Sequence, residues 1–350
     1  MYDWRKTLLP SDAPMERAIK VLDIEALRIV MVVDTNGKLL GTVTDGDVRR
    51  ALIRHMGMDT PLSQLMCTNP TTASVDEDYE HIQQLMKSRQ HLQVPLLDQQ
   101  DKVVGLQMCS YLDNSRKFDN PVVLMAGGFG KRLHPLTKDI PKPLLKVGTK
   151  PILETILGQF IDSGFSNFYI STHYKADQIK AHFGNGHQWG VNISYIDEEQ
   201  PLGTAGALGN LPEKVADQDL IVMNGDLLTK IDFRELMGFH REQGGVATMC
   251  VREYDFQVPY GVVESDNHKV NKIVEKPIHK FFVNAGIYVL GKEVMRLINK
   301  DQYLDMTELL DERVQGKETV SVFPVHEYWM DIGRMNDFEA AQVDYLSMFS

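Results

Sequence analysis

The first 110 residues alternate between helical and β-strand patterns of hydrophobic positions. Apolar residues recur at helical spacing over Met15–Leu27, and two apolar runs of strand character follow at Ile29–Val33 and Leu39–Val43. Turn-forming residues at Asp34–Gly37 separate the two runs. A second helix is expected to start near Val48. The pattern therefore predicts a unit with the order helix, strand, turn, strand, helix.

The same order returns about 64 residues further along the chain, which indicates an internal repeat. The second copy has helical spacing over Tyr79–Ser88 and strand patterns over Gln93–Leu97 and Lys102–Gln107. Asp34 in the first turn aligns with Asp98 in the second. Because each copy has only about 50 to 60 residues, neither can bury a large core by itself. We predict that the two copies pack as one compact pair.

A glycine, a hydroxyl residue and an aspartate are spaced along the stretch Gly41–Asp47. This pattern resembles the ligand site of CBS domains, and the repeat as a whole resembles a tandem CBS (Bateman) module. The resemblance implies that Thr44 and Asp47 bind the ribose and phosphate of an adenine nucleotide. In the second copy Met108 and Tyr111 stand at these two positions, so at most one of the two sites is intact.

The aspartates of this stretch also have a structural explanation. Asp is a favoured N-cap residue, so Asp45 and Asp47 can cap the helix that is expected to start near Val48. The sequence therefore leaves open whether the pair binds a nucleotide or has a dimerisation or purely structural role.

A glycine-rich turn, Ala126–Arg132, directly follows the apolar run Pro121–Met125. In α/β sheets a turn of this kind after a strand brings backbone N–H groups close to phosphate. The dinucleotide-binding fingerprint does not fit, because it needs a third glycine where Leu133 stands, and the P-loop needs Ser or Thr where Arg132 stands. The turn therefore predicts a phosphate site of another type.

The turn reads Gly-Gly-x-Gly-x-Arg, and Pro-Lys-Pro-Leu follows at Pro141–Leu144. This combination resembles the sugar-phosphate nucleotidyltransferase family, over about residues 121–338. The resemblance implies an α/β fold with a Rossmann-like mixed sheet, and a reaction that joins a nucleoside triphosphate to a hexose 1-phosphate and releases pyrophosphate. It also implies a set of nucleotide-binding residues: Ala126, Gly127, Gly128, Gly130, Gly203 and Thr204.

Two basic residues in these motifs are the catalytic candidates. The sugar phosphate attacks the α-phosphorus in line, so catalysis consists mainly of positioning and electrostatic stabilisation. Arg132 can offer a fork of donors to the departing β- and γ-phosphates. Lys142, between two prolines, would supply a point charge near the α-phosphate. No general base is needed, because the attacking group is already an anionic oxygen.

Two aspartates are the candidates for a metal site. Asp226 comes shortly after the apolar run Leu220–Met223, which places it at the carboxyl end of a strand, where ligands bind in open α/β sheets. Asp331 directly follows Tyr328–Met330. The family resemblance implies that both bind Mg²⁺, a cation that prefers one or two carboxylates together with phosphates and water. Alternatively, each aspartate is a turn or N-cap residue.

A further series of motifs resembles the sugar-recognition strands of the family. The resemblance implies that Glu275 accepts hydrogen bonds from sugar hydroxyls, that Lys276 pairs with the sugar phosphate and that Asn284 faces the hexose. Alternatively, Glu275 and Lys276 form an exposed ion pair. His173 and Tyr174 are additional candidates for the nucleotide pocket. The sugar-phosphate candidates are Tyr260, Gly261, Glu275, Lys276 and Asn284.

Composition and charge limit the classes of partner. A formal net charge of −11 argues against a general nucleic-acid binder, because such proteins cluster Lys and Arg against phosphates. Cys67, Cys109 and Cys250 are too few and too widely spaced for a disulfide framework. No apolar run approaches the roughly 20 residues that span a bilayer. We expect a cytoplasmic homo-oligomer that binds neither nucleic acid nor membrane.

We predict a CBS module over residues 1–115, a linker over residues 116–120 and a nucleotidyltransferase domain over residues 121–350. This architecture resembles the glucosamine-1-phosphate guanylyltransferases of bacterial legionaminic acid synthesis, which makes GTP and glucosamine 1-phosphate the first choice of substrates. Three alternatives stay open: GTP with mannose 1-phosphate, another hexose 1-phosphate with UTP, dTTP or CTP, and an inactive protein that only senses nucleotides.

Overall fold

The computed structural model describes residues 3–25, 27–89, 91–109 and 117–348. It divides into two compact units, Met1–Arg116 and Lys117–Ser350. Tyr111 and the first residue of the expected linker, Arg116, lie outside the described residues. Among the described residues, no helix has both the length and the apolar composition that a membrane span requires.

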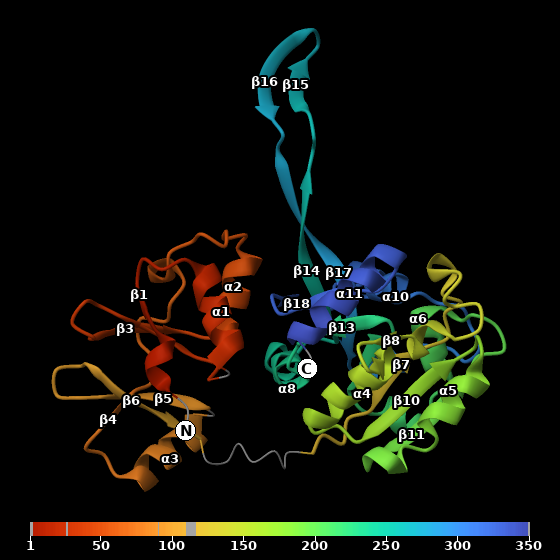
Figure 1. The fold of residues 1–350 in the computed structure, drawn as a ribbon, viewed down its shortest axis with the longest axis horizontal. Helices are drawn as coiled ribbons and strands as arrows, with labels where there is room; N and C mark the ends of the chain where they lie inside the picture. The colour runs from red at the N-terminus through yellow and green to blue at the C-terminus, as the bar shows by residue number, and fades with distance from the viewer. Residues whose placement is uncertain (1–2, 26, 90, 110–116, 349–350) are drawn as a thin grey trace. The chain divides into compact units, whose positions relative to one another are not determined.

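The first unit contains two three-stranded sheets with the same topology (Figure 1). In each sheet a short outer strand runs parallel to the middle strand, and a hairpin adds the third strand antiparallel. Both hairpins have a register shift at the equivalent place, between Val32 and Val33 and between Leu96 and Leu97. The elements are η1 (Trp4–Thr7), β1 (Leu8–Pro10), α1 (Met15–Glu25), β2 (Val30–Val33), β3 (Leu39–Val43), α2 (Asp45–Ile53), η2 (Leu62–Gln64), β4 (Ala73–Ser74), α3 (Tyr79–Arg89), β5 (Gln93–Leu97) and β6 (Val103–Met108).

The two copies of the repeat pack against each other, as predicted. The backbone N–H of Leu39 donates to the carbonyl oxygen of Asp101 at 3.0 Å, and that of Val103 donates to Gly37 at 3.0 Å. A small buried core draws side chains from both copies: Leu27, Ile29, Met31 and Leu106. Neither copy could form this core alone.

Helix α2 begins at Asp45, three residues before the predicted start near Val48. Thr44 is the N-cap residue, and its backbone N–H donates to the Asp47 carboxylate at 2.9 Å. Asp47 therefore closes a capping box from the third helical position. The apolar periodicity starts only at Val48, which is why the sequence pattern missed the first turn.

The second unit is built on a seven-stranded mixed sheet with strand order β11-β10-β7-β12-β17-β14-β18. The strands β11, β10, β7 and β12 are parallel, whereas β17 runs antiparallel to both of its neighbours. The predicted α/β fold with a mixed sheet is confirmed. The strands are β7 (Val122–Met125), β8 (Lys146–Val147), β9 (Lys150–Pro151), β10 (Asn167–Thr172), β11 (Asn192–Asp197), β12 (Leu220–Asn224), β13 (Leu227–Thr229), β14 (Ala247–Gln257), β15 (Gly261–Asp266), β16 (Lys269–Glu275), β17 (Ile278–Leu290), β18 (Val320–Val325) and β19 (Trp329–Asp331).

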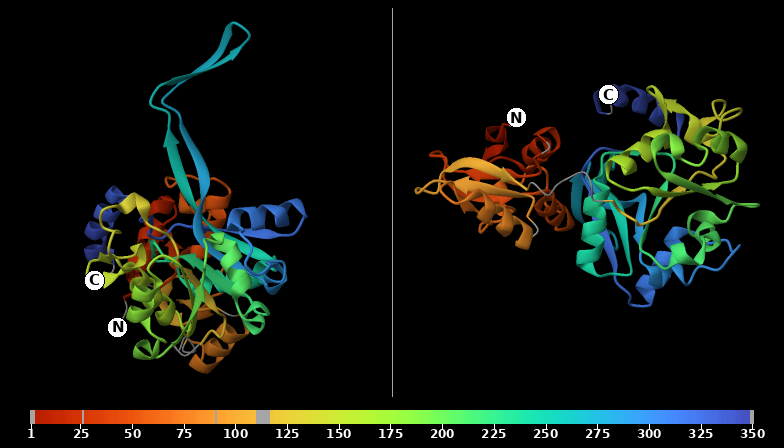
Figure 2. Two further views of the ribbon diagram at one scale, coloured as in Figure 1. Left: turned by 90° about the vertical axis from the view of Figure 1, so that its right-hand side faces the viewer. Right: turned by 90° about the horizontal axis from the view of Figure 1, so that it is seen from below.

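Helices cover both faces of this sheet (Figure 2). On β7, Val122 and Leu124 belong to one buried core and Val123 to the other, because successive strand residues point to opposite faces. Burial on both faces explains the nearly continuous apolar runs of β7 and β12. The helices are η3 (Lys131–Leu133), η4 (Lys142–Leu144), α4 (Ile152–Asp162), α5 (Ala176–Phe183), η5 (His187–Trp189), α6 (Gly203–Gly206), η6 (Ala207–Asn210), α7 (Glu213–Ala216), α8 (Phe233–Gln243), α9 (Lys292–Met295), α10 (Met306–Gln315) and α11 (Met335–Met348).

The predicted linker ends in residues that pack onto the second unit. Phe118 stacks on Phe165 with ring centroids 4.7 Å apart. Asn120 donates through Nδ2 to the carbonyl oxygen of Asp219 at 2.8 Å. Lys117–Asn120 is therefore part of the second unit, held there by both the aromatic contact and hydrogen bonds.

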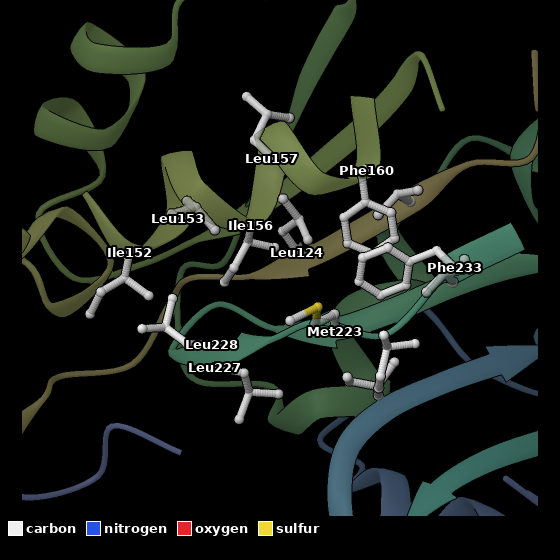
Figure 3. Close-up of a cluster of buried hydrophobic side chains, with 14 of the residues drawn as sticks. Leu124, Ile152, Leu153, Ile156, Leu157, Phe160, Met223, Leu227, Leu228 and Phe233 are labelled. Atoms are coloured by element: carbon white, nitrogen blue, oxygen red, sulfur yellow. The ribbon is translucent and has the colours of Figure 1, made fainter. Parts of the chain in front are cut away.

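Phe160 of α4 lies at the centre of the larger core, where it stacks on Phe233 with ring centroids 3.7 Å apart (Figure 3). Its side chain is completely buried. We expect Phe160→Ala to lower the free energy of unfolding by about 3–5 kcal/mol, because the substitution leaves a large cavity. Urea denaturation of the two proteins would measure the difference, and a loss below about 1 kcal/mol would contradict this packing.

A long two-stranded arm projects from the second unit (Figures 1 and 2). The outer part of β14 pairs with the first part of β17 from Val251–Asn284 to Gln257–Ile278, and the hairpin β15–β16 continues beyond this ladder. The term arm is used below for residues 254–281.

Candidate active site

A cavity of about 270 Å³ lies at the carboxyl ends of β7 and β12. Its walls include five of the six nucleotide-binding candidates: Ala126, Gly127, Gly128, Gly203 and Thr204. The sixth, Gly130, is not among the residues that line the cavity. It has φ +61°, and an added Cβ would lie 2.8 Å from Thr137 Cγ2, so only glycine fits this turn into η3.

The sequence did not single out Glu198, which also lines the cavity. Its carboxylate accepts hydrogen bonds from the Ser171 hydroxyl and from the backbone N–H of Leu202, the latter at 2.9 Å. The residue directly follows the carboxyl end of β11, the sheet edge at which functional side chains are expected. That position was the one available sequence signal for it.

His173 and Tyr174 lie beside the cavity rather than in its wall. His173 Nδ1 is 2.8 Å from the carbonyl oxygen of Glu198. The rings of His173 and Tyr174 lie 5.4 and 5.5 Å from the ring of Phe129, which does line the cavity. The rings of the two residues therefore pack against Phe129. The sequence did not predict Phe129 as a cavity residue, because it occupies a variable position of the Gly-Gly-x-Gly-x-Arg motif.

Lys142 and Asp226 form an ion pair at the cavity wall. The Lys142 side chain is 9% exposed and the Asp226 side chain 28%. Asp226 is held close to β7 because Gly225 precedes it: an added Cβ on Gly225 would lie 2.6 Å from the carbonyl oxygen of Met125. The close approach of these two strand ends brings the cation and the carboxylate to one place.

The short pair β13–β19 brings the second aspartate to the first. Leu227 is paired with Asp331, and the backbone N–H of Ile332 donates to the carbonyl oxygen of Asp226 at 3.1 Å. The pKa of Asp331 lies above its ordinary value, first because the protein removes part of its hydration and then because Asp226 carries a like charge. Both observations place the two carboxylates in one electrostatic site.

Arg132 of η3 completes this cluster. An added Cβ on Gly333 would lie 3.5 Å from Asp331 Oδ2 and 3.6 Å from both Nη atoms of Arg132. The charges of Lys142 and Arg132 oppose the increase in the pKa of Asp331. Two cations and two carboxylates that are widely separated in the sequence therefore meet beside the cavity.

The two carboxylates suit a magnesium ion that also binds substrate. Among the residues that the structure describes, no group of three His, Cys, Asp or Glu side chains could hold a metal. A pair of carboxylates with further ligands from phosphate and water is what Mg²⁺ prefers. The carboxylate of Asp226 faces a positive charge, the ammonium group of Lys142. These donors fit Mg²⁺.

The raised pKa of Asp331 predicts how the protein responds to pH. At neutral pH the ionised carboxylate costs folding free energy, and this cost disappears when the pH falls through the raised pKa and the carboxyl binds a proton. Without divalent cations, Asp331→Asn should therefore increase the melting temperature at neutral pH. We expect less than about 1 kcal/mol, because Asp331 is solvent-exposed. Thermal melts at neutral and acidic pH would test this, and a difference that grows on acidification would contradict it.

The structure does not bring four of the sugar-phosphate candidates to the cavity: Tyr260, Gly261, Glu275 and Lys276. They lie on the arm, where Tyr260 is 74% exposed. Asn284 at the base of the arm accepts a hydrogen bond from the backbone N–H of Gly286 at 2.9 Å and donates to the Tyr288 hydroxyl at 2.6 Å. The strand from Asn284 to Ile278 covers seven residues, and the six steps between its ends span about 20 Å. The expectation that all five residues gather around one substrate therefore does not hold in this structure.

A second cavity, of about 300 Å³, lies in the first unit and includes Thr44 and Asp47 in its lining. Asp47 is buried, and its carboxylate accepts hydrogen bonds from the Thr44 hydroxyl at 2.8 Å and from Arg50 at 2.6 Å. Arg50 also lines this cavity. Thr44 and Asp47 therefore line the cavity and also cap helix α2. Nucleotide binding and helix capping are thus compatible explanations of this stretch.

The fold and the cluster of charges define a nucleotide-handling α/β domain behind a CBS pair. Residues 121–348 match the family model described as nucleotidyl transferase, and residues 7–54 and 62–106 each match that of the CBS domain. The chain belongs to the nucleotidyl transferase family and carries a CBS pair ahead of that domain.

Individual relatives share the second unit. The mannose-1-phosphate guanyltransferase of Debaryomyces hansenii is 33% identical over 237 residues, which cover 65% of each chain, and that of Pichia angusta is 34% identical over 234 residues, 64% of each. The chain thus spans about 65% of the length of these relatives. The solved structure of HddC from Yersinia pseudotuberculosis is 29% identical with a TM-score of 0.52, and the match covers 65% of this chain and 99% of that one. HddC has also been solved in complex with GMP-PN.

Proposed function

We propose that the second unit transfers GMP from GTP to a hexose 1-phosphate. An oxygen of the sugar phosphate attacks the α-phosphorus, the bond from that phosphorus to the bridging oxygen breaks, and pyrophosphate leaves with the electron pair. The observation that carries the proposal is the meeting of Arg132, Lys142, Asp226 and Asp331 beside a cavity lined by the glycine turn.

The glycine turn, the two cations and the two carboxylates would have different tasks. Backbone N–H groups of the glycine turn would hold the triphosphate. Lys142 would stabilise the charge that develops around the α-phosphorus, and Arg132 would bind the departing pyrophosphate. Asp226 and Asp331 would hold Mg²⁺, which when bound supplies positive charge to the phosphate oxygens. Because Lys142 is paired with Asp226, its ammonium group already lies at the cavity wall.

The names of the relatives support GTP as the donor. The two yeast relatives are guanyltransferases, and the HddC structure holds GMP-PN. For the acceptor, the yeast relatives point to mannose 1-phosphate, whereas the CBS pair ahead of the catalytic unit resembles the glucosamine-1-phosphate guanylyltransferases. These two sugar phosphates are the first acceptors to test.

The test is a pyrophosphate-release screen of GTP, UTP, dTTP and CTP against a panel of hexose 1-phosphates, with Mg²⁺ present. We expect release with GTP and either mannose 1-phosphate or glucosamine 1-phosphate. Release with a pyrimidine nucleotide alone would refute the donor. No release with any pair, together with tight GTP binding, would support the alternative of a nucleotide sensor. The complete set of four charged residues favours the enzyme over that alternative.

The first unit is proposed to bind an adenine nucleotide at Thr44 and Asp47 and thereby change the transferase rate. The supporting observation is the 300 Å³ cavity, to which Arg50 adds a cation suited to phosphate. We expect Arg50→Ala to weaken AMP binding to the full chain at least about tenfold in calorimetry, as for the loss of one charged contact. Arg54→Ala, which removes an exposed arginine at the end of the same helix, is the matched control. No heat of binding from the unmodified chain would refute the site.

A further inference from the structure

The arm exposes an unusual concentration of large apolar side chains. Eight of the 21 exposed large hydrophobic residues among those that the structure describes lie on its 28 residues. Scattered single apolar residues are normal on a surface, whereas a group of this size usually marks a binding surface. The eight are Tyr254, Phe256, Tyr260, Val263, Val270, Ile273, Ile278 and Phe281.

The register of the outer hairpin separates an apolar face from a charged face. Val263 pairs with Ile273, and beyond a register shift between Glu264 and Ser265, Val270 pairs with Ser265. Because Val263 and Ser265 point to the same side of their strand, the three aliphatic side chains share one face. Their exposed fractions are 53%, 66% and 59% for Val263, Ile273 and Val270. The opposite face holds the apolar pair Val262–Val274 near the base of the hairpin and, towards the tip, two cross-strand pairs of opposite charge, Glu264 with Lys272 and Asp266 with Lys269. The hairpin is therefore amphipathic.

The inner part of the arm has an aromatic face. Tyr254 pairs with Phe281, and Phe256 pairs with His279, which places all four rings on one side of the ladder. The His279 and Phe281 rings stack with centroids 6.3 Å apart. Tyr254, Phe256 and Phe281 are each more than half exposed.

An arm of this kind needs a partner for its apolar faces. A two-stranded hairpin in water is at best marginally stable, unless a hydrophobic face packs against something else. Figures 1 and 2 show no helix or strand of the second unit beside the outer hairpin. A surface that covers the apolar faces of the outer hairpin must therefore come from outside the second unit.

We propose that a second copy of this chain covers the arm, with the apolar faces of two arms packed against each other in a dimer. The charges on the arm favour this partner. Its residues carry four acidic and four basic side chains and are neutral overall, whereas the whole chain has a net charge of −11. Two copies repel each other least where the surface is neutral. A nucleic acid or an anionic membrane would instead require an excess of basic residues.

Self-complementarity also favours a second copy. In a dimer with twofold symmetry the same patch meets itself, so a mainly apolar face is a suitable surface. The one charged side chain on this face, Glu275, lies across from Gly261 at the base of the hairpin. On the opposite face, four of the eight charged residues of the arm lie across from a residue of opposite charge. Face-to-face packing of the two hairpins would give a four-stranded, two-layered structure and bury Val263, Val270 and Ile273 together.

Sedimentation of the full chain over a range of concentrations tests this proposal. We expect a species of twice the 39.7 kDa chain mass. The triple variant Val263→Thr, Val270→Thr, Ile273→Thr keeps β-branched residues in the strands but removes the apolar surface, and it should weaken the dimer at least about tenfold. Val104→Thr with Val322→Thr, at exposed strand positions outside the arm, should leave the dimer unchanged.

Amide hydrogen exchange of residues 261–275 tests whether the arm itself packs in the dimer, even if two chains also associate through another surface. In the dimer these amides should exchange slowly, and dilution or the triple substitution should make them exchange fast. Fast exchange in the undiluted chain, or protection that persists in a monomer, would refute the proposal. Hydrogen exchange does not depend on transfer activity. The dimer proposal can therefore be refuted or supported independently of the proposed function.

Discussion

Replacing Asp226 with Asn is expected to reduce pyrophosphate release by about 10³-fold or more. Asn keeps the shape of the side chain but removes the charge that would hold the metal and that now pairs with Lys142. A metal ion that neutralises phosphate charge in a transition state is worth several kcal/mol, which corresponds to this factor. Stability should change little, since Lys142 loses its counter-ion while the repulsion between Asp226 and Asp331 disappears.

Single-turnover pyrophosphate release and Mn²⁺ binding would both be measured for Asp226→Asn. Asp217→Asn is a suitable control, because Asp217 is 62% exposed and forms a surface ion pair with Arg296 away from the cavity. The control should keep full activity and metal binding. Normal turnover by Asp226→Asn would overturn both the metal site and the role of the cluster.

Replacing Lys142 with Met is expected to lower kcat by about 10²–10³-fold, the usual cost of removing one donor that stabilises charge in a transition state. Met has a similar length and is apolar, so the substitution removes the charge while filling the same space. The 9% exposure of the Lys142 side chain means that no neighbouring surface residue can readily take its place.

The same substitution should tighten metal binding when no nucleotide is present. Removing Lys142 frees the carboxylate of Asp226 from its present counter-ion. For Lys142→Met, kcat should therefore fall, whereas the affinity for Mn²⁺ measured by titration should rise. Lys146→Met, at an exposed position of the same segment, should behave like the unmodified protein. Equal losses of activity in both variants would argue against a specific role for Lys142.

The sequence was sufficient to predict the features that depend on residues close together in the chain. The 64-residue repeat, the glycine turn after β7 and the acid after β12 are local patterns, and the structure contains each of them. Apolar patterns also predicted the hairpin strands of the repeat and the strands β7 and β12, the last two because strands buried on both faces need continuous apolar runs. It missed the first turn of α2, where the capping residues Thr44 and Asp47 are polar.

The sequence did not predict contacts between segments that are far apart in the chain. The meeting of Asp226 and Asp331 depends on the pairing of Leu227 with Asp331 across about 100 residues, and no local pattern contains that register. Likewise, the motifs around Tyr260 and Lys276 suggest a sugar site, but the continuous pairing of β14 with β17 from Val251–Asn284 to Gln257–Ile278 carries these residues away from the cavity. Glu198 was missed because its role depends on Ser171 and Leu202.

By itself, the sequence determined the class of both units, the phosphate-binding turn and the types of residue that would act on a triphosphate. Only the tertiary structure decided which of those residues share one site, and that the arm presents an uncovered apolar surface. The physical reason is that propensity, periodicity and capping act over a few residues, whereas strand register and side-chain burial depend on the packing of the whole unit.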